Sequence, residues 1–334
     1  MKERTAMKIA VVGTGMIARE ALAALRKVEN VEVTGLCARP HSLDKARALA
    51  QEFGVSEVTT DYEEMLARHN ADFVYLGIVN SAHFDYARQA IEAGWHVIVE
   101  KPFASTLAET EELIARARAA HCYLFEAMTP LFLPNYLGIL EALPSLGLIR
   151  LVQANFSQYS SRYDRYLARD VAPAFDPSLS GGALYDLNVY NVSLITSLFG
   201  RPKSATYAAN IGFNGIDTSG VLTMRYNGFV ATAAAAKDSS SPSFFMIQGE
   251  SGWIRAEGIP SELSSFTVGL RGREPKTYAM NRHAHRMVHE FEAMRDIFAR
   301  QDYMSVEEGL QTSRTVIAVM EKARLMAGIQ FRAD

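Results

Sequence analysis

The sequence has little cysteine, little net charge and no long hydrophobic run. Its two cysteines, Cys37 and Cys122, can form at most one disulfide, and their spacing matches no zinc motif. A disulfide-stapled fold is therefore excluded, and no metal site is expected. We expect both cysteines to be small buried apolar side chains.

The formal net charge is -3, which gives the protein no basic surface for gathering nucleic acid. The opening stretch, MKERTAMKIAVVG, has only about six apolar residues before glycines interrupt it, too few for a signal peptide or a membrane span. We therefore expect a cytoplasmic protein with neither a nucleic-acid partner nor a membrane partner.

A length of 334 residues exceeds what one core usually supports and points to about two domains. Up to residue 128, short β-branched apolar runs alternate with amphipathic helical segments. The runs lie at 8–12, 31–38, 72–78, 96–100 and 122–128. This alternation predicts an α/β domain with a doubly wound parallel sheet and helices on both faces.

Beyond residue 128 the pattern changes to successive strand-like runs separated by turn residues. Helical patterns remain only at 181–200, 282–300 and 305–326. A second, α+β domain with a mostly antiparallel sheet is therefore predicted. We divide the chain into domains 1–128 and 129–334, which leaves the C-terminal helices free to pack back on the first domain.

A glycine fingerprint, VVGTGMIA, lies between the first strand and the first helix. Gly13 permits a tight turn, Gly15 lets the backbone approach a pyrophosphate, and Ala18 allows close helix packing. The helix N-terminus adds hydrogen-bond donors and a positive dipole. This context predicts a dinucleotide site. The loop residues expected to contact the cofactor are Gly13, Thr14, Gly15, Met16 and Ile17.

The second strand ends in CARPHS, without the acidic residue that commonly binds the ribose of NAD. Arg39 is placed to meet a 2′-phosphate, so NADP is favoured over NAD. The alternative is that Arg39 is a solvated residue before the helix cap Ser42, because NAD can also bind without the acid.

The predicted strand at 72–78 runs into GIVNSAHFDYA, in a turn that should face the cofactor. We expect Val79, Asn80 and His83 to contact the cofactor there. An isolated histidine is also commonly a packed or exposed side chain.

The predicted strand at 96–100 ends in Glu100 and is followed by Lys101 and Pro102. Both charged residues are expected at the same sheet edge, facing a cleft and the cofactor. Lys101 is a candidate contact for a substrate oxygen and the nicotinamide, and Pro102 fixes the backbone after it. A surface ion pair is the alternative.

In the segment SGGALYDLNVYN, Asp186 and Tyr190 are four residues apart and share a helical face. An acid and a phenol presented together suit proton transfer, although an ordinary hydrogen bond or simple packing of Tyr190 fits as well.

Arg162 and Tyr163, in SQYSSRYDRYLARD, are candidate substrate contacts, with a solvated loop or a subunit contact as alternatives.

Four motifs in this order and spacing resemble the glucose-fructose oxidoreductase, inositol dehydrogenase and MocA (Gfo/Idh/MocA) family over nearly the whole chain. They are VVGTGMIA, VNSAHF, VEKPFA and GGALYDLNVYN. The resemblance implies a Rossmann domain, a second domain whose large sheet has one open face, and NAD(P)-dependent oxidation or reduction of a sugar, polyol or related diol. It also implies a homodimer or homotetramer formed through that sheet.

The resemblance further implies catalytic roles for three residues. Lys101 would orient the substrate and stabilise its reacting oxygen, in front of a cis bond to Pro102. Asp186 would be the motif carboxylate, and Tyr190 would occupy the proton-transfer position that holds His or Tyr. Asn188 stands where many members have Gly, which makes it a candidate substrate contact.

Two other functions remain open at this stage. A cofactor-binding regulator could keep the fold without turnover, although the intact set of motif residues argues against it. A glycosidase that uses bound NAD for transient oxidation would retain its cofactor without net NADH formation.

Overall fold

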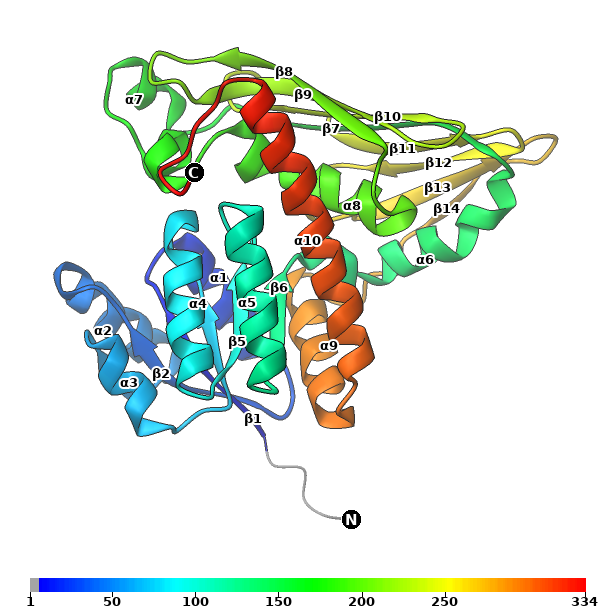
Figure 1. Ribbon diagram of the computed structural model, residues 1–334. Coiled ribbons are helices and arrows are strands. Elements are labelled where there is room, and N and C mark those ends of the chain that lie inside the picture. The colour runs from blue at the N-terminus through cyan, green and yellow to red at the C-terminus, as the bar shows by residue number, and fades with distance from the viewer. Residues whose placement is uncertain (1–5) are drawn as a thin grey trace. The chain divides into compact units, whose positions relative to one another are not determined.

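A computed structural model describes residues 6–334 (Figure 1). The chain forms two compact units. Unit 1 holds 6–104, Ala108–Ala127 and His285–Gln311, and unit 2 holds Ser105–Leu107, Met128–Ala284 and Thr312–Asp334. The division at residue 128 stays a prediction. None of the helices within residues 6–334 combines the length and hydrophobicity that crossing a bilayer requires.

Unit 1 contains six parallel strands in the order β3-β2-β1-β4-β5-β6, which confirms the predicted doubly wound sheet. Their bounds are β1 Met7–Val12, β2 Val31–Cys37, β3 Glu57–Thr59, β4 Phe73–Leu76, β5 His96–Glu100 and β6 Leu124–Ala127. Strand β4 is buried along its whole length, as expected where helices cover both faces of a parallel sheet. The short β3 lies outside the predicted runs.

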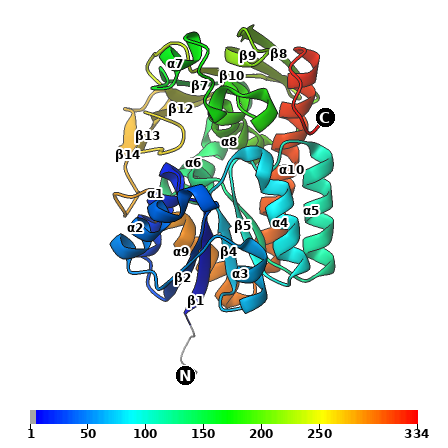
Figure 2. The same ribbon diagram turned by 90° about the vertical axis from the view of Figure 1, so that its left-hand side faces the viewer.

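The helices of unit 1 are α1 Met16–Leu25, α2 Leu43–Phe53, α3 Tyr62–Arg68, α4 His83–Glu92, α5 Leu107–Ala119 and α9 Met287–Arg300. Figures 1 and 2 show α4 and α5 on one face of the sheet and α1 and α9 on the other. Helices α1 and α9 also contact each other, so a helix from late in the chain completes this layer.

Unit 2 contains eight strands in the order β14-β13-β12-β11-β7-β10-β9-β8. Their bounds are β7 Ile149–Ser157, β8 Ser204–Ile211, β9 Asp217–Arg225, β10 Val230–Ala236, β11 Phe244–Gly249, β12 Gly252–Glu257, β13 Ser265–Leu270 and β14 Lys276–Tyr278. Only β7 and β10 pair in parallel, which confirms the predicted mostly antiparallel sheet. In β8, buried Ala205 and Tyr207 alternate with exposed Ser204 and Thr206, so one face of the sheet is covered and the other is open.

The helices of unit 2 include α6 Pro134–Ala142, α7 Tyr163–Leu167 and α8 Val189–Phe199. Helix α10, Tyr303–Met326, begins in unit 1 and continues in unit 2 from Thr312. Helix α8 packs against β7 and β10. The helix predicted at 181–200 opens with a π-helix, Leu184–Asn188, that runs directly into α8.

Candidate active site

The predicted cofactor segments of unit 1 all follow the carboxyl ends of parallel strands. Val12 of β1 pairs with Leu76 of β4, and Leu76 pairs with Val99 of β5. The glycine loop, the turn after β4 and the Glu100–Lys101 pair therefore begin at one level of the sheet. Strands β1 and β4 adjoin at the point where the strand order reverses, which is where ligands bind in doubly wound sheets.

Gly13 and Gly77 allow the loop after β1 to approach β4 closely. Gly13 has φ +117°, and a Cβ atom there would lie 2.2 Å from the Gly77 oxygen. A Cβ atom on Gly77 would in turn lie 3.3 Å from the Cβ of Ala18. Larger side chains at these positions would push α1 away from the sheet, so the fingerprint has the packing role that the sequence predicts.

Gly15 is the N-cap of α1 and has open space in front of it. No heavy atom lies within 4 Å of the position that a Cβ would take. No side chain caps the helix here, and its first turn has no acidic residue. The N–H groups of the first turn and the helix dipole thus fit the pyrophosphate of a dinucleotide.

Arg39 follows β2 and is exposed, directly before the short 3-10 helix Pro40–Ser42. Within residues 6–334 its guanidinium forms no salt bridge. Ser42 is the N-cap residue of α2, but its side chain makes no capping hydrogen bond. An exposed guanidinium at this strand end can bind a phosphate.

Glu100 is buried and does not face a cleft as the sequence predicts, while its contact with the cofactor stays a prediction. Only 5% of the residue is exposed, and its Oε1 accepts a 2.5 Å hydrogen bond from the Tyr75 hydroxyl. Its Oε2 accepts from the Lys101 backbone N–H at 3.2 Å. Burial raises the pKa of Glu100, and the Tyr75 hydrogen bond and the Lys101 charge oppose that rise. Glu100 therefore anchors the backbone at the end of β5.

The Lys101 to Pro102 bond is cis, as the resemblance implied, and Lys101 is partly exposed. Below this loop lies His83, which is fully buried. Its Nδ1 is 2.9 Å from the Pro102 oxygen, and its Nε2 is 3.3 Å from the Ile78 oxygen. Burial lowers the pKa of His83 to about 4. His83 thus supports the Lys101 loop from inside, and its contact with the cofactor stays a prediction.

Asp186 in unit 2 pairs with a lysine that the sequence analysis missed. Lys237 follows the alanine-rich strand β10, and its Nζ donates to Asp186 Oδ2 at 2.7 Å. The same ammonium donates to the Ala174 oxygen at 2.5 Å and lies 4.4 Å from the centre of the Phe175 ring. The Lys237 side chain is 2% exposed, whereas that of Asp186 is 32% exposed. A single charge at the end of an alanine run was the available signal.

Hydrogen bonds hold the π-helix that carries Asp186. Buried Asp217 accepts from the Leu184 backbone N–H at 2.6 Å and from the Tyr207 hydroxyl at 2.7 Å. Asn188 donates to the Ala233 oxygen of β10 at 2.8 Å. Asn188 is fully buried and also accepts from a neighbouring asparagine amide. Asn188 thus helps to hold the π-helix, and its contact with the substrate stays a prediction.

Tyr190 lies in the first turn of α8 and is 8% exposed. Its ring packs 5.8 Å from that of Phe156. Arg162, just before α7, is exposed, and Tyr163 is half-buried. The Tyr163 ring contacts Phe175, the residue whose ring covers the Lys237 ammonium. The candidate substrate segment is thus joined by packing to the partner of Asp186.

Comparison with known proteins places this geometry in a family. The profile described as "Oxidoreductase family, NAD-binding Rossmann fold" matches residues 7–128, and the "GFO/IDH/MocA C-terminal domain" profile matches 144–255. The uncharacterized oxidoreductase YgjR of Escherichia coli (strain K12) is 33% identical over 328 residues, covering 98% of both chains. The scyllo-inositol 2-dehydrogenase (NADP(+)) IolU of Bacillus subtilis (strain 168) is 32% identical over 328 residues, covering 98% of this chain and 99% of IolU.

Among solved structures, KijD10, a 3-ketoreductase from Actinomadura kijaniata in complex with NADP and TDP-benzene, superposes with a TM-score of 0.82. The match covers 95% of this chain and 97% of KijD10 at 21% identity, and it shows a common fold. Full-length relatives above 30% identity, together with both domain profiles, establish the relationship. The chain belongs to the GFO/IDH/MocA family of NAD(P)-dependent oxidoreductases.

Proposed function

We propose that this oxidoreductase uses NADP(H) to interconvert a carbinol and a carbonyl on a sugar, polyol or related diol. The observation that carries the proposal is that the glycine loop and Lys101 follow β1 and β5, the two strands that flank β4 in one sheet. A dinucleotide whose pyrophosphate is bound by the glycine loop would place its nicotinamide ring near the strand end that carries Lys101.

The cofactor half of the proposal assigns three groups of residues. Gly13, Thr14, Gly15, Met16 and Ile17 would hold the pyrophosphate, Arg39 the 2′-phosphate, and Val79 and Asn80 the nicotinamide half. When bound, the dinucleotide supplies a hydride acceptor or donor at nicotinamide C4. The exposed Arg39 supports NADP over NAD, as does the NADP(+) in the name of the relative IolU.

The remaining chemistry falls to three side chains. Tyr190, as the phenolate, would accept the substrate hydroxyl proton during oxidation, and as the phenol it would return that proton to the carbonyl oxygen during reduction. The Lys101 ammonium would stabilise negative charge on the reacting oxygen. Asp186 would orient Lys101 or a neighbouring substrate hydroxyl.

Joint action of Lys101 and Asp186 is supported by the path of the chain. Ser105 lies four residues after Lys101 and already belongs to unit 2. There its carbonyl accepts from the Tyr185 hydroxyl at 3.2 Å, and its Oγ lies 2.6 Å from that of Ser180. Tyr185 directly precedes Asp186. The short segment from Lys101 to Ser105 therefore ends at a residue that is hydrogen-bonded to the neighbour of Asp186.

The substrate class rests on similarity and on the α7 segment. IolU is named for a cyclic polyol, and KijD10 for reduction of a ketone. Arg162 and Tyr163 would provide a charged donor and an aromatic surface, and a hydroxyl-rich ring has polar edges and apolar faces that suit both.

The first test is titration of the purified protein with NADPH and NADH, followed by turnover assays on inositols, aldoses and cyclic diols. Lys101→Ala and Tyr190→Phe are each expected to lower kcat by about 100-fold or more while cofactor affinity stays within about threefold. Tyr226→Phe is the matched control, since the Tyr226 hydroxyl bonds only to the Gly200 oxygen at a distant turn. Normal turnover by the first two variants would refute the assigned roles.

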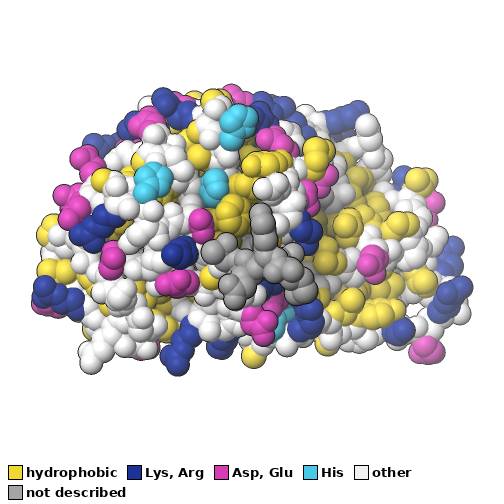
Figure 3. Space-filling model, turned by 90° about the horizontal axis from the view of Figure 1, so that it is seen from below, with side chains coloured by type: hydrophobic (Ala, Val, Ile, Leu, Met, Phe, Trp, Pro, Cys, Tyr) yellow, Lys and Arg dark blue, Asp and Glu magenta, His cyan; other side chains and the backbone are white. Residues whose placement is uncertain are grey.

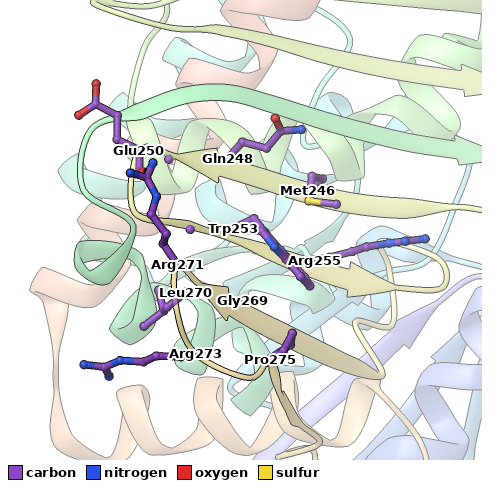
Figure 4. Close-up of a pocket in the computed structure, with 12 residues that line it drawn as sticks. Met246, Gln248, Glu250, Trp253, Arg255, Gly269, Leu270, Arg271, Arg273 and Pro275 are labelled. Carbon is purple, nitrogen blue, oxygen red and sulfur yellow. Dashed lines mark hydrogen bonds between the residues drawn. The ribbon is translucent and has the colours of Figure 1, made fainter.

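We also propose a homodimer or homotetramer formed through the open face of the eight-stranded sheet. A groove of about 550 Å³ on the β11–β13 part of the sheet is lined by Trp253, Arg255 and Arg271, among others (Figure 4). The Trp253 indole lies over Gly269, where an added Cβ would come within 2.3 Å of the ring. A flat aromatic surface of this kind suits packing against a second sheet.

Exposed hydrophobic side chains add support to an oligomer. Figure 3 shows hydrophobic side chains gathered on one part of the surface seen from below. On the open face of the sheet, Val221 of β9 is 44% exposed and pairs with the exposed Ala208 of β8. Thr232→Arg would place a charge in the middle of the open face, on β10, and is expected to yield monomers by light scattering, whereas Thr232→Ser should behave as wild type. A monomeric wild-type protein would overturn this assembly.

A further inference from the structure

Lys237 is a buried cation that the chemistry proposed above does not use. Moving an ammonium out of water costs several kcal/mol unless charge and hydrogen bonds compensate it. Three groups do so here: the Asp186 carboxylate, the Ala174 carbonyl and the face of the Phe175 ring. All of them belong to unit 2.

The neighbouring contacts fix the backbone around Asp186, and Lys237 contacts its carboxylate directly. Asp217 holds the first residue of the π-helix and Asn188 holds the last, and neither bond involves the Asp186 side chain. Lys237 provides the 2.7 Å contact to Oδ2 itself. The Asp186 side chain is 32% exposed, so the buried Lys237 ammonium contacts one side of the carboxylate while another part stays accessible to solvent.

We propose that Lys237 is a positioning residue that sets the orientation and negative charge of Asp186 for turnover. This inference rests on the proposed function of Asp186. A stability role is a poorer explanation of the lysine, because well-packed apolar residues usually stabilise a core as well as a buried ion pair does. The inward-facing residues that precede it on β10, Ala231, Ala233 and Ala235, are all small and apolar. We therefore assign the charge of Lys237 to the orientation of the Asp186 carboxylate.

Lys237→Met keeps most of the side-chain volume and removes the charge. We expect kcat with the best substrate to fall by about 10- to 100-fold, with substrate KM and the Kd of NADPH each changed by less than about threefold. Lys237→Arg, which restores a cation, should recover part of that loss. A purely structural role predicts no such split between kcat and KM and no recovery by arginine.

The decisive comparison uses Asp186→Asn with and without Lys237→Met. If Lys237 acts through Asp186, the double variant turns over within about twofold of Asp186→Asn alone. A further drop equal to that of Lys237→Met in the wild-type background would overturn the proposal. The double variant also removes both charges together, so it keeps the test valid if an unpaired Asp186 prevents Lys237→Met from folding.

Failure of the proposed function gives a different result. Wild-type activity in Asp186→Asn would refute the role of Asp186 whatever the lysine does. Wild-type kcat in Lys237→Met, with Asp186→Asn impaired, would refute only the positioning role of Lys237.

Discussion

The Tyr75 hydroxyl and the Glu100 carboxylate form a 2.5 Å hydrogen bond between neighbouring strands β4 and β5. The other carboxylate oxygen accepts from the backbone N–H of Lys101. A buried acid thus ties the strand end that presents the candidate catalytic lysine to the centre of the sheet. The two adjacent charged residues therefore have different roles: Glu100 anchors the backbone inside the sheet, and Lys101 is partly exposed.

Tyr75→Phe should therefore destabilise the protein by about 1–3 kcal/mol at pH 7, because it leaves a buried carboxylate without its donor. The pKa of Glu100 is already raised by burial, and loss of the hydrogen bond would raise it further. A raised carboxyl pKa means that stability is lost as the pH rises above the unfolded value of 4.5. Urea unfolding should show a larger loss at pH 7 than at pH 5. Tyr62→Phe, which removes a hydroxyl bonded to a backbone oxygen, should cost the same at both. A pH-independent loss in Tyr75→Phe would contradict the account.

His83 should make stability depend on pH between 6.5 and about 4. Burial lowers its pKa from 6.5 to about 4, so its contribution is complete above pH 6.5 and is lost as the pH falls through that range. The full shift corresponds to about 3 kcal/mol. We expect His83→Asn to flatten this part of the unfolding profile, measured by chemical denaturation, while His41→Asn, at an exposed position, leaves it unchanged. Parallel profiles for wild type and His83→Asn would show that the buried ring does not titrate as described.

Arg39→Ser should weaken NADPH binding by about 10- to 100-fold, the loss expected for a charged hydrogen bond, and leave NADH binding within about twofold. The measurement is nicotinamide fluorescence titration at fixed ionic strength. Lys45→Ser, on an exposed position of α2, makes the same change in net charge and is expected to affect both cofactors little. Equal effects of the two substitutions would indicate a diffuse charge effect and remove Arg39 from the site.

Asp334→Asn should destabilise the protein by about 3 kcal/mol. Asp334 accepts two hydrogen bonds from Arg324, at 2.7 and 2.5 Å, and the Arg324 side chain is only 1% exposed. The substitution would leave a buried guanidinium without its counter-charge. The exposed pair of Asp44 and Arg47 is the matched control, so Asp44→Asn should cost less than about 1 kcal/mol. Similar midpoints in thermal unfolding for both variants would contradict the structural reading.

Local patterns predicted the elements and the strand ends, because burial on both faces requires continuous apolar runs. Strands β3 and β14 were missed because each has three residues and no fully buried position. The sequence also offers Asp61 and Ser81 as N-cap residues. Asp61 caps α3 by accepting from the Glu64 N–H at 2.9 Å, whereas a 3-10 turn at Asn80–Ala82 precedes α4 and makes Ala82 its N-cap in place of Ser81.

Side-chain direction was harder to predict than position. The sequence places His83 and Glu100 at the correct sheet edge, but whether a ring or carboxylate points inward depends on partners such as Tyr75, on another strand. Lys237 lies 51 residues from Asp186, and no local period relates the two. Contacts of that kind arise only when β10 packs beside the helix.

The π-helix at Leu184–Asn188 gives Asp186 and Tyr190 different kinds of helical turn within one continuous segment. A π turn accommodates one more residue than an α turn, so it behaves as a built-in insertion. Deleting a single residue there would let the segment continue as a regular α-helix and would change the angle between the two side chains about the helix axis. A change in the length of this segment would therefore alter the relative orientation of Asp186 and Tyr190, whereas a substitution at either position keeps the backbone register.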